Sequence, residues 1–239
     1  MIRLALILGA VLLPAAAQAQ DLTIPLGADG TFSARVVQLI AVVTLLSLAP
    51  GLAVMVTCFP FIVTVLSILR QAIGLQAAPP NMLIVSLALF LTWFVMDPVL
   101  TAAWEAGLRP LLDGQVAPEV ALADAAVPFR GFMLARVDEG TLLALADLRP
   151  GGGALVPAEA PFSVLVPAFM LSEIARAFEI GFLIFLPFLV IDLVVAAVLM
   201  SMGMMMVPPA VVALPFKLAF FVVADGWRLL AEALVRSYG

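Results

Sequence analysis

The fold of this chain is decided at residues 200–209, which read MSMGMMMVPP. Gly203 permits backbone angles that other residues resist. Pro208 and Pro209 lack a backbone N–H donor, so they stop a helix and push Val207 toward extended angles. We therefore expect a bend between two helices, with its hinge at Gly203, Pro208 and Pro209.

This bend is rich in methionine. Of the 11 methionines in the chain, five lie here: Met200, Met202, Met204, Met205 and Met206. Methionine is unbranched and polarizable, so its side chain adapts to changing shapes. Three interpretations are possible: core packing, a deformable seal in a pore, and a Cu(I) site. The last is considered because thioethers are suitable ligands for Cu(I). The chain has no His and one Cys, Cys58, so a copper path would depend on thioethers alone.

The composition is that of a membrane protein. Of the 239 residues, 65% are hydrophobic and only 11% are charged, and the mean hydropathy is +1.23. Soluble domains are about 45–50% apolar and about 25% charged. Lipid or partner subunits must therefore cover part of the chain. The net charge of −5 without a basic stripe argues against nucleic-acid binding.

Residues 1–19 are predicted to be a secretory signal peptide. Arg3 supplies the positive start, Leu4–Leu13 the short apolar core and Ala17-Gln18-Ala19 the cleavage site. The mature chain would begin near Gln20, with its new N-terminus outside the cytoplasm.

Residues 20–103 are predicted to form an N-terminal apolar helical hairpin. Val36–Leu69 carries no charge and exceeds the about 20 residues of one membrane span. Pro50-Gly51 and Pro60 interrupt it, so we expect one long kinked helix or two shorter ones.

The second uncharged stretch, Met82–Met96, is short for a span. Its helix must therefore extend past Asp97 or rest against protein neighbours. Asn81 is a candidate N-cap for this helix.

Residues 104–162 are predicted to form a water-exposed insert. The segment is acidic and contains clusters of Gly and Pro, and the spacing of its apolar residues predicts a helix over Phe129–Leu148. Its acidic bias favours the periplasmic side, because cytoplasmic loops favour Lys and Arg.

Residues 163–239 are predicted to form a C-terminal helical hairpin with the methionine-rich loop at its bend. Pro187 is expected to kink the first arm. Four charged residues of the tail are spaced by three, four and four, which predicts a self-paired, exposed helix face. They are Asp225, Arg228, Glu232 and Arg236.

Two charges interrupt the apolar arms of this hairpin, Asp192 before the bend and Lys217 after it. A charge at the bilayer centre is costly, so such residues normally pair and face protein or water. Their distances from the bend place them at similar depth. The pair would fix the hairpin, or else line an aqueous path or contact a neighbouring subunit.

Glu173, Arg176 and Glu179 share one helix face, where Arg176 can reach either carboxylate. We favour an intersubunit or interhelix role for them over catalysis. The sequence has no His, no Ser/His/Asp set and no phosphate-binding loop. It therefore predicts no enzyme activity, no catalytic residue, no cofactor and no metal site.

The chain resembles the flagellar biosynthetic protein FliP family, the export-gate subunit of type III secretion, from about Leu46 to Gly239. Besides the methionine run, these segments carry the resemblance: Leu48-Ala49-Pro50, Leu66–Gly74, Pro79-Pro80-Asn81 with Ala88–Thr92, Phe132-Met133-Leu134, Pro167-Ala168-Phe169 with Leu171-Ser172-Glu173, Phe185-Leu186-Pro187-Phe188 with Ile191-Asp192-Leu193, and Leu214-Pro215-Phe216-Lys217 with Asp225-Gly226-Trp227.

The resemblance implies an all-α membrane protein of kinked or broken helical hairpins, with a small, mainly helical soluble insert and packing that depends on oligomer formation. It implies several copies around a path for unfolded export substrates, with FliQ and FliR as small partners, in the inner membrane at the flagellar basal body. It also implies that the five methionines form a gasket around the pore. A small-solute transporter and a Cu(I) transporter are the alternatives.

The chain departs from the family pattern in two places. Pro60-Phe61 stands where the family usually has a hydroxyl residue and an Arg, and Asp97 stands where it commonly has a small uncharged residue. Either change would alter a partner surface or mark a divergent member.

Overall fold

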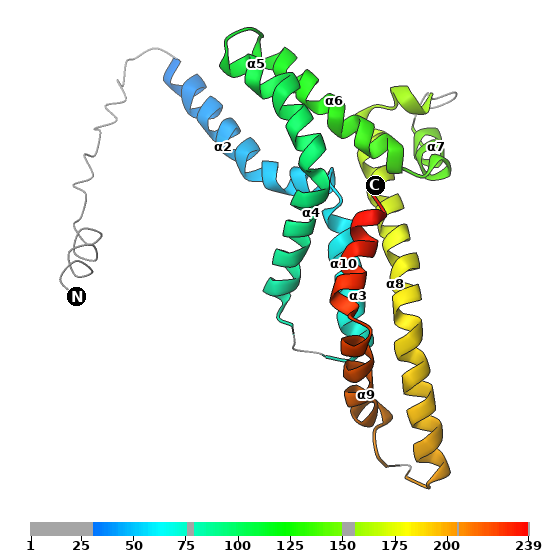
Figure 1. Ribbon diagram of the computed structural model, residues 1–239. Helices are drawn as coiled ribbons and strands as arrows, with labels where there is room; N and C mark the ends of the chain where they lie inside the picture. Colours follow the sequence, from blue (N-terminus) through cyan, green and yellow to red (C-terminus); the bar gives the residue numbers. More distant parts are fainter. Residues whose placement is uncertain (1–30, 76–78, 150–155, 205, 239) are drawn as a thin grey trace, which may run out of the picture. The chain divides into compact units, whose positions relative to one another are not determined.

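The computed structural model describes residues 31–75, 79–149, 156–204 and 206–238 (Figure 1). All regular elements within these ranges are helical, and no strand occurs in them, which confirms the predicted all-α class. The predicted signal peptide, residues 1–19, lies outside the described residues. Residues 1–48 and 49–239 form two units, and the site described below belongs to the second.

The uncharged run of the N-terminal half forms two helices, α2 (Thr31–Met55) and α3 (Phe59–Ile73). The break between them falls after Met55 and not at a proline. Pro60 lies in the first turn of α3, where its missing N–H leaves no helical bond unmade. Gly74 ends α3 with a φ of 88°.

Helix α4 (Asn81–Ala103) continues through Asp97 and Pro98, so the short apolar stretch does extend. A π turn, η1 (Trp104–Leu108), joins it to α5 (Arg109–Leu112). The predicted Asn81 cap is wrong, because the N-cap is Pro80. The Asn81 side chain instead accepts a hydrogen bond from the Arg70 guanidinium.

Helices α6 (Pro118–Arg136) and α7 (Glu139–Asp147) replace the single helix predicted over Phe129–Leu148. The helix ends because Asp138 adopts extended angles and caps α7: its carboxylate accepts the Thr141 N–H at 2.7 Å. A short 3₁₀ turn, η2 (Pro157–Glu159), leads into α8.

The C-terminal hairpin is built from α8 (Phe162–Ser201), α9 (Pro209–Val223) and α10 (Gly226–Arg236). Figure 1 shows α9 and α10 returning along α8 after the turn at its lower end. Pro187 lies inside α8 and does not end the helix. The axes of α9 and α10 differ by 62°.

Two helical stretches, Asn81–Leu112 and Phe162–Ser201, are long and apolar enough to cross a membrane, and the bent pair α9 and α10 is a third if it forms one span. The main core lies along α3, whose Phe61, Ile62 and Val65 are fully buried. Helix α3 packs chiefly on α8 and also contacts α4 and α9. It therefore supports the hairpin from the side.

Candidate functional site at the α8–α9 corner

The corner after α8 is a Schellman motif. Gly203 has a φ of 74°, its N–H donates to the Met200 carbonyl at 3.0 Å, and the Met204 N–H donates to the Leu199 carbonyl at 3.0 Å. This motif satisfies the last carbonyls of a helix and favours glycine at the left-handed position. Pro208 is the N-cap and Pro209 the first residue of α9. Gly203, Pro208 and Pro209, all predicted as hinge residues, thus lie where the chain reverses, whereas the fourth, Pro187, lies inside α8.

The methionines of the corner project away from the core. Met200, Met202, Met204 and Met206 are between 42% and 97% exposed. The fifth predicted seal residue, Met205, lies outside the described residues. Side chains this exposed do not fill the core of their own chain, so their apolar surface is free to contact lipid, a partner or a passing chain.

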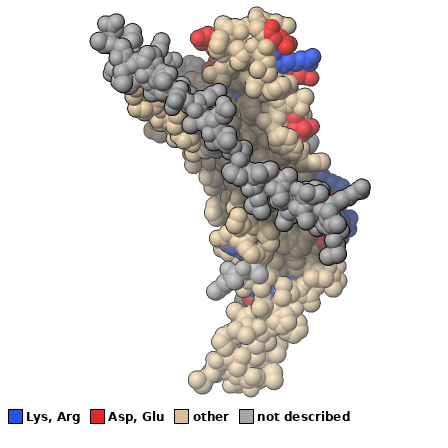
Figure 2. All heavy atoms as spheres, turned by 90° about the vertical axis from the view of Figure 1, so that its left-hand side faces the viewer, with Lys and Arg blue, Asp and Glu red and all other residues tan. Residues whose placement is uncertain are grey.

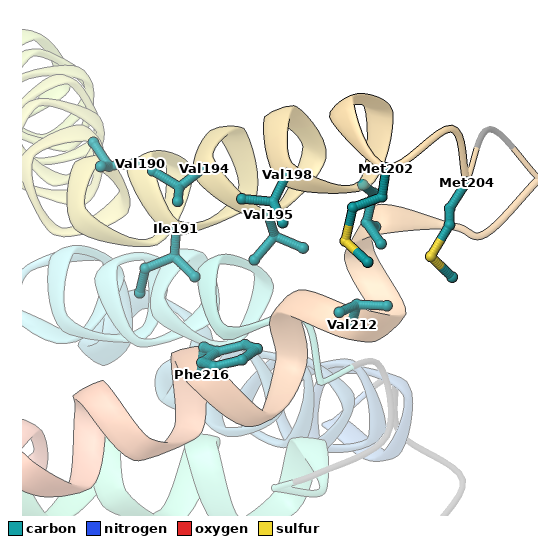
Figure 3. Close-up of a pocket in the computed structure, with 10 residues that line it drawn as sticks. Val190, Ile191, Val194, Val195, Val198, Met202, Met204, Val212 and Phe216 are labelled. Atoms are coloured by element: carbon teal, nitrogen blue, oxygen red, sulfur yellow. The ribbon is translucent and has the colours of Figure 1, made fainter.

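An apolar groove of about 530 Å³ separates the two arms next to the corner. Figure 3 shows Val195 and Val198 of α8 facing Val212 and Phe216 of α9 across it, with Met202 and Met204 at the corner end. On the face drawn in Figure 2, no charged group lies at this end of the hairpin. The corner therefore presents an uncharged surface on this face.

An ion pair joins the two arms next to the groove, at the residues that follow Ile191 and Phe216 of its lining. Lys217 Nζ lies 2.6 Å from Asp192 Oδ2 and also donates to the Ala72 carbonyl at 3.0 Å. The Lys217 side chain is 7% exposed and that of Asp192 31%. The pairing that spacing predicted is thus present, and through Ala72 it also ties the hairpin to the end of α3.

A second polar cluster surrounds Glu173, which is completely buried. Its carboxylate accepts hydrogen bonds from Arg136 Nε at 3.1 Å and from the Tyr238 hydroxyl, and Arg176 lies 3.8 Å away. Arg136 also lies 4.0 Å from the centre of the Tyr238 ring and donates to the Ser237 carbonyl at 2.5 Å. The cluster therefore joins α6, α8 and the C-terminal tail.

Sequence reasoning missed Arg136 and Tyr238, which are 37 and 65 residues from Glu173. No local spacing connects them. It placed Glu179 with the buried charges, but Glu179 is exposed and forms no ion pair in the part of the chain that the structure describes. Arg176 turns toward Glu173 only. Burial, followed by the negative charge of Glu173, raises the pKa of Tyr238, so its hydroxyl remains a donor.

The sequence model of the FliP family matches residues 42–234, which contain the corner, the ion pair and Glu173. The chain belongs to the FliP family. Three similar proteins carry the name "Flagellar biosynthetic protein FliP". That of Caulobacter vibrioides is 53% identical over 228 residues, 95% of this chain and 86% of the relative. That of Agrobacterium fabrum is 49% identical over 212 residues, 88% of this chain and 86% of the relative.

A more distant FliP protein, from Bacillus subtilis, is 42% identical over 202 residues, 84% of this chain and 91% of the relative. The chain therefore spans most of the length of these FliP proteins. Tyr238, which donates to Glu173, lies beyond the residues that the FliP family model matches.

Proposed function

We propose that this FliP-family chain is a non-catalytic subunit of the export gate in flagellar type III protein secretion. Several copies, together with FliQ and FliR, would surround a passage for unfolded proteins in the inner membrane. Family membership, the flagellar names of the similar proteins and the long apolar helices support this proposal.

The observation that carries the proposal is the exposed methionine corner, held on a fixed hairpin. A pore for unfolded chains must admit many sequences and still exclude ions when idle. Flexible thioether side chains adapt to different shapes, and an apolar constriction excludes water by dewetting. Four exposed methionines and the apolar groove beside them supply such a surface.

The surrounding residues would keep this soft surface in place. The Asp192–Lys217 pair would fix the two arms of the hairpin against each other, while Gly203, Pro208 and Pro209 define its turn. Glu173, with Arg176 beside it, would anchor the insert and the C-terminal tail on α8. We place the insert, residues 104–162, on the periplasmic side, between a hairpin over 20–103 and the C-terminal hairpin over 163–239.

Ion leakage tests the seal. We expect membranes containing the assembly with Met204, Met205 and Met206 all changed to Ala to conduct ions more than wild type. The control is Met55→Ala with Met82→Ala, which removes two exposed methionines that are not part of the corner. Unchanged leakage in the triple variant would overturn the seal.

The same purified protein separates the alternatives. The described residues contain no group of three or more His, Cys, Asp or Glu that could hold a metal ion. Stoichiometric retention of Cu(I) would therefore point to the methionine thioethers as ligands and favour a copper carrier. Uptake of a small solute by the chain alone in liposomes would favour a transporter.

A further inference from the structure

Helix α8 exposes an apolar face that is longer than a bilayer is thick. Its exposed side chains include Leu171 near one end, Phe178 and Phe182 in the middle and Met200 at the other end. At about 1.5 Å per residue, the stretch of α8 from Leu171 to Met200 extends about 44 Å, whereas the hydrocarbon core measures about 30 Å. A bilayer is therefore too thin to cover all of this face, and a second protein surface can bury the rest.

Glu179 lies within this face, one turn from Ala175 and from Phe182. It is exposed and has no ion pair among the described residues, since the neighbouring Arg176 turns inward to Glu173. A carboxylate that protein covers needs a cation or hydrogen-bond donors. The covering surface must therefore be apolar along most of its length and positive at the level of Glu179.

The α9–α10 side of this chain offers such a surface. Val211, Val222 and Val223 of α9 are exposed, and α10 continues with the exposed Arg228 and Arg236. With increasing distance from the corner, this surface changes from apolar on α9 to charged on α10. The exposed surface of α8 likewise becomes charged at Glu179.

The two changes occur at the same height. Leu229 and Leu230 of α10 line one small cavity with Ile180 and Ile184 of α8, so the middle of α10 lies level with the turn next to Glu179. If a second copy lay alongside at the same height, its apolar α9 surface would contact the apolar part of α8. The arginines of its α10 would then lie near Glu179.

We propose that the exposed face of α8 docks on the α9–α10 face of a second copy, with Glu179 paired to Arg236 of that copy. We favour Arg236 over Arg228, because Arg228 already forms a short ion pair of 2.5 Å with Asp225. Arg236 is 81% exposed, and its ion pair with Glu232 is longer, at 3.7 Å. Two different faces meet, which is a heterologous contact that repeats around an axis. The inference rests on the proposed function, in which several copies of the chain assemble.

A charge swap tests this contact in the full-length protein purified in detergent, with self-association measured by native mass and by analytical ultracentrifugation. We expect Glu179→Arg and Arg236→Glu each to weaken self-association at least tenfold. The double variant should recover most of it, because the pair is re-formed with reversed charges. Glu119→Arg, at an exposed acidic residue of α6 outside both faces, is the matched control and should assemble as wild type does.

The outcomes separate this contact from the proposed function. If wild type assembles and the swap variants assemble equally well, or the double variant fails to recover, the contact is wrong while the export-gate proposal stands. A wild-type chain that stays monomeric even with its small partners would remove both. Single changes that alter bound lipid but not assembly would identify lipid as the cover of this face. Circular dichroism on each variant, together with the milder Glu179→Gln, separates loss of the contact from loss of the fold.

Discussion

Lys217 on α9 and Asp192 on α8 form an ion pair of 2.6 Å where the end of α3 meets the C-terminal hairpin. The lysine is buried and also donates to the Ala72 carbonyl, whereas the second oxygen of Asp192 is buried without a hydrogen-bond partner among the described residues. The Lys217 ammonium group thus connects α9 to both α8 and α3. The pair joins α8 to α9, and the hydrogen bond to Ala72 adds α3 to this junction.

Removal of one member of this pair should destabilise the chain strongly. We expect Asp192→Asn to cost about 3 kcal/mol of unfolding free energy, because it leaves the Lys217 charge buried without its counter-ion. The double variant Asp192→Asn with Lys217→Met should lie closer to wild type, since no uncompensated charge remains. Denaturant unfolding in detergent measures both. Equal stability of the single variant and wild type would show that the pair contributes nothing.

The Tyr238 hydroxyl should contribute to the attachment of the C-terminal tail. Tyr238→Phe removes a donor to the fully buried Glu173 carboxylate, which should cost about 1–3 kcal/mol. The phenyl ring keeps its contacts with Arg136 and Phe132, so Tyr238→Leu should be more destabilising still. Hydrogen exchange at the end of α6 and in the tail checks the order, and equal protection in wild type and both variants would contradict it.

Gly203 should be sensitive to a single added methyl group. A Cβ at this position meets no atom within 4 Å, so Gly203→Ala tests the backbone alone. Because φ is 74°, we expect a cost of about 1–2 kcal/mol. Gly131→Ala is the control: it also meets open space, but it lies inside α6, where Ala is favoured over Gly by up to about 1 kcal/mol. Thermal unfolding should therefore shift in opposite directions for the two variants.

The stability of α7 should depend on acid pH. The Thr141 backbone N–H, followed by its hydroxyl, holds the pKa of Asp138 below its ordinary value of 3.8. Because the folded state lowers this pKa, the cap contributes fully above 3.8 and is lost as the pH falls through the lowered value. Amide exchange in α7 should accelerate over that range. Asp138→Asn should keep a cap and lose this pH dependence, and an unchanged pH profile in the variant would contradict the assignment.

Several local features of this fold could be predicted from the sequence. The i,i+3 and i,i+4 spacings that join Asp225, Arg228 and Glu232 correspond to observed ion pairs on α10, because residues three and four apart are neighbours on any helix. The position of the bend also follows from local chemistry, since Gly203 and the two prolines restrict their own backbone.

Other boundaries needed tertiary context. Pro50-Gly51 and Pro60 were expected to kink the apolar run or divide it into two helices, and it does form two. However, α2 continues through Pro50, and the break follows Met55, just before the first turn of α3. Asn81 was expected to cap α4, but its side chain binds Arg70 instead. The capping preference of Asn81, which is worth about 1 kcal/mol, was overridden by this hydrogen bond between two helices.

The sequence by itself determined that this chain is helical, too apolar to stand alone in water and bent at a methionine-rich corner, because these properties depend on composition and on residues adjacent along the chain. Only the tertiary structure decided that Glu173 meets Arg136 and Tyr238, that Lys217 reaches Ala72, and that Glu179 is left on the outer face of α8. Such contacts join residues far apart in the sequence. They depend on how whole helices pack, which is the sum of many weak apolar contacts and not a property of any one segment.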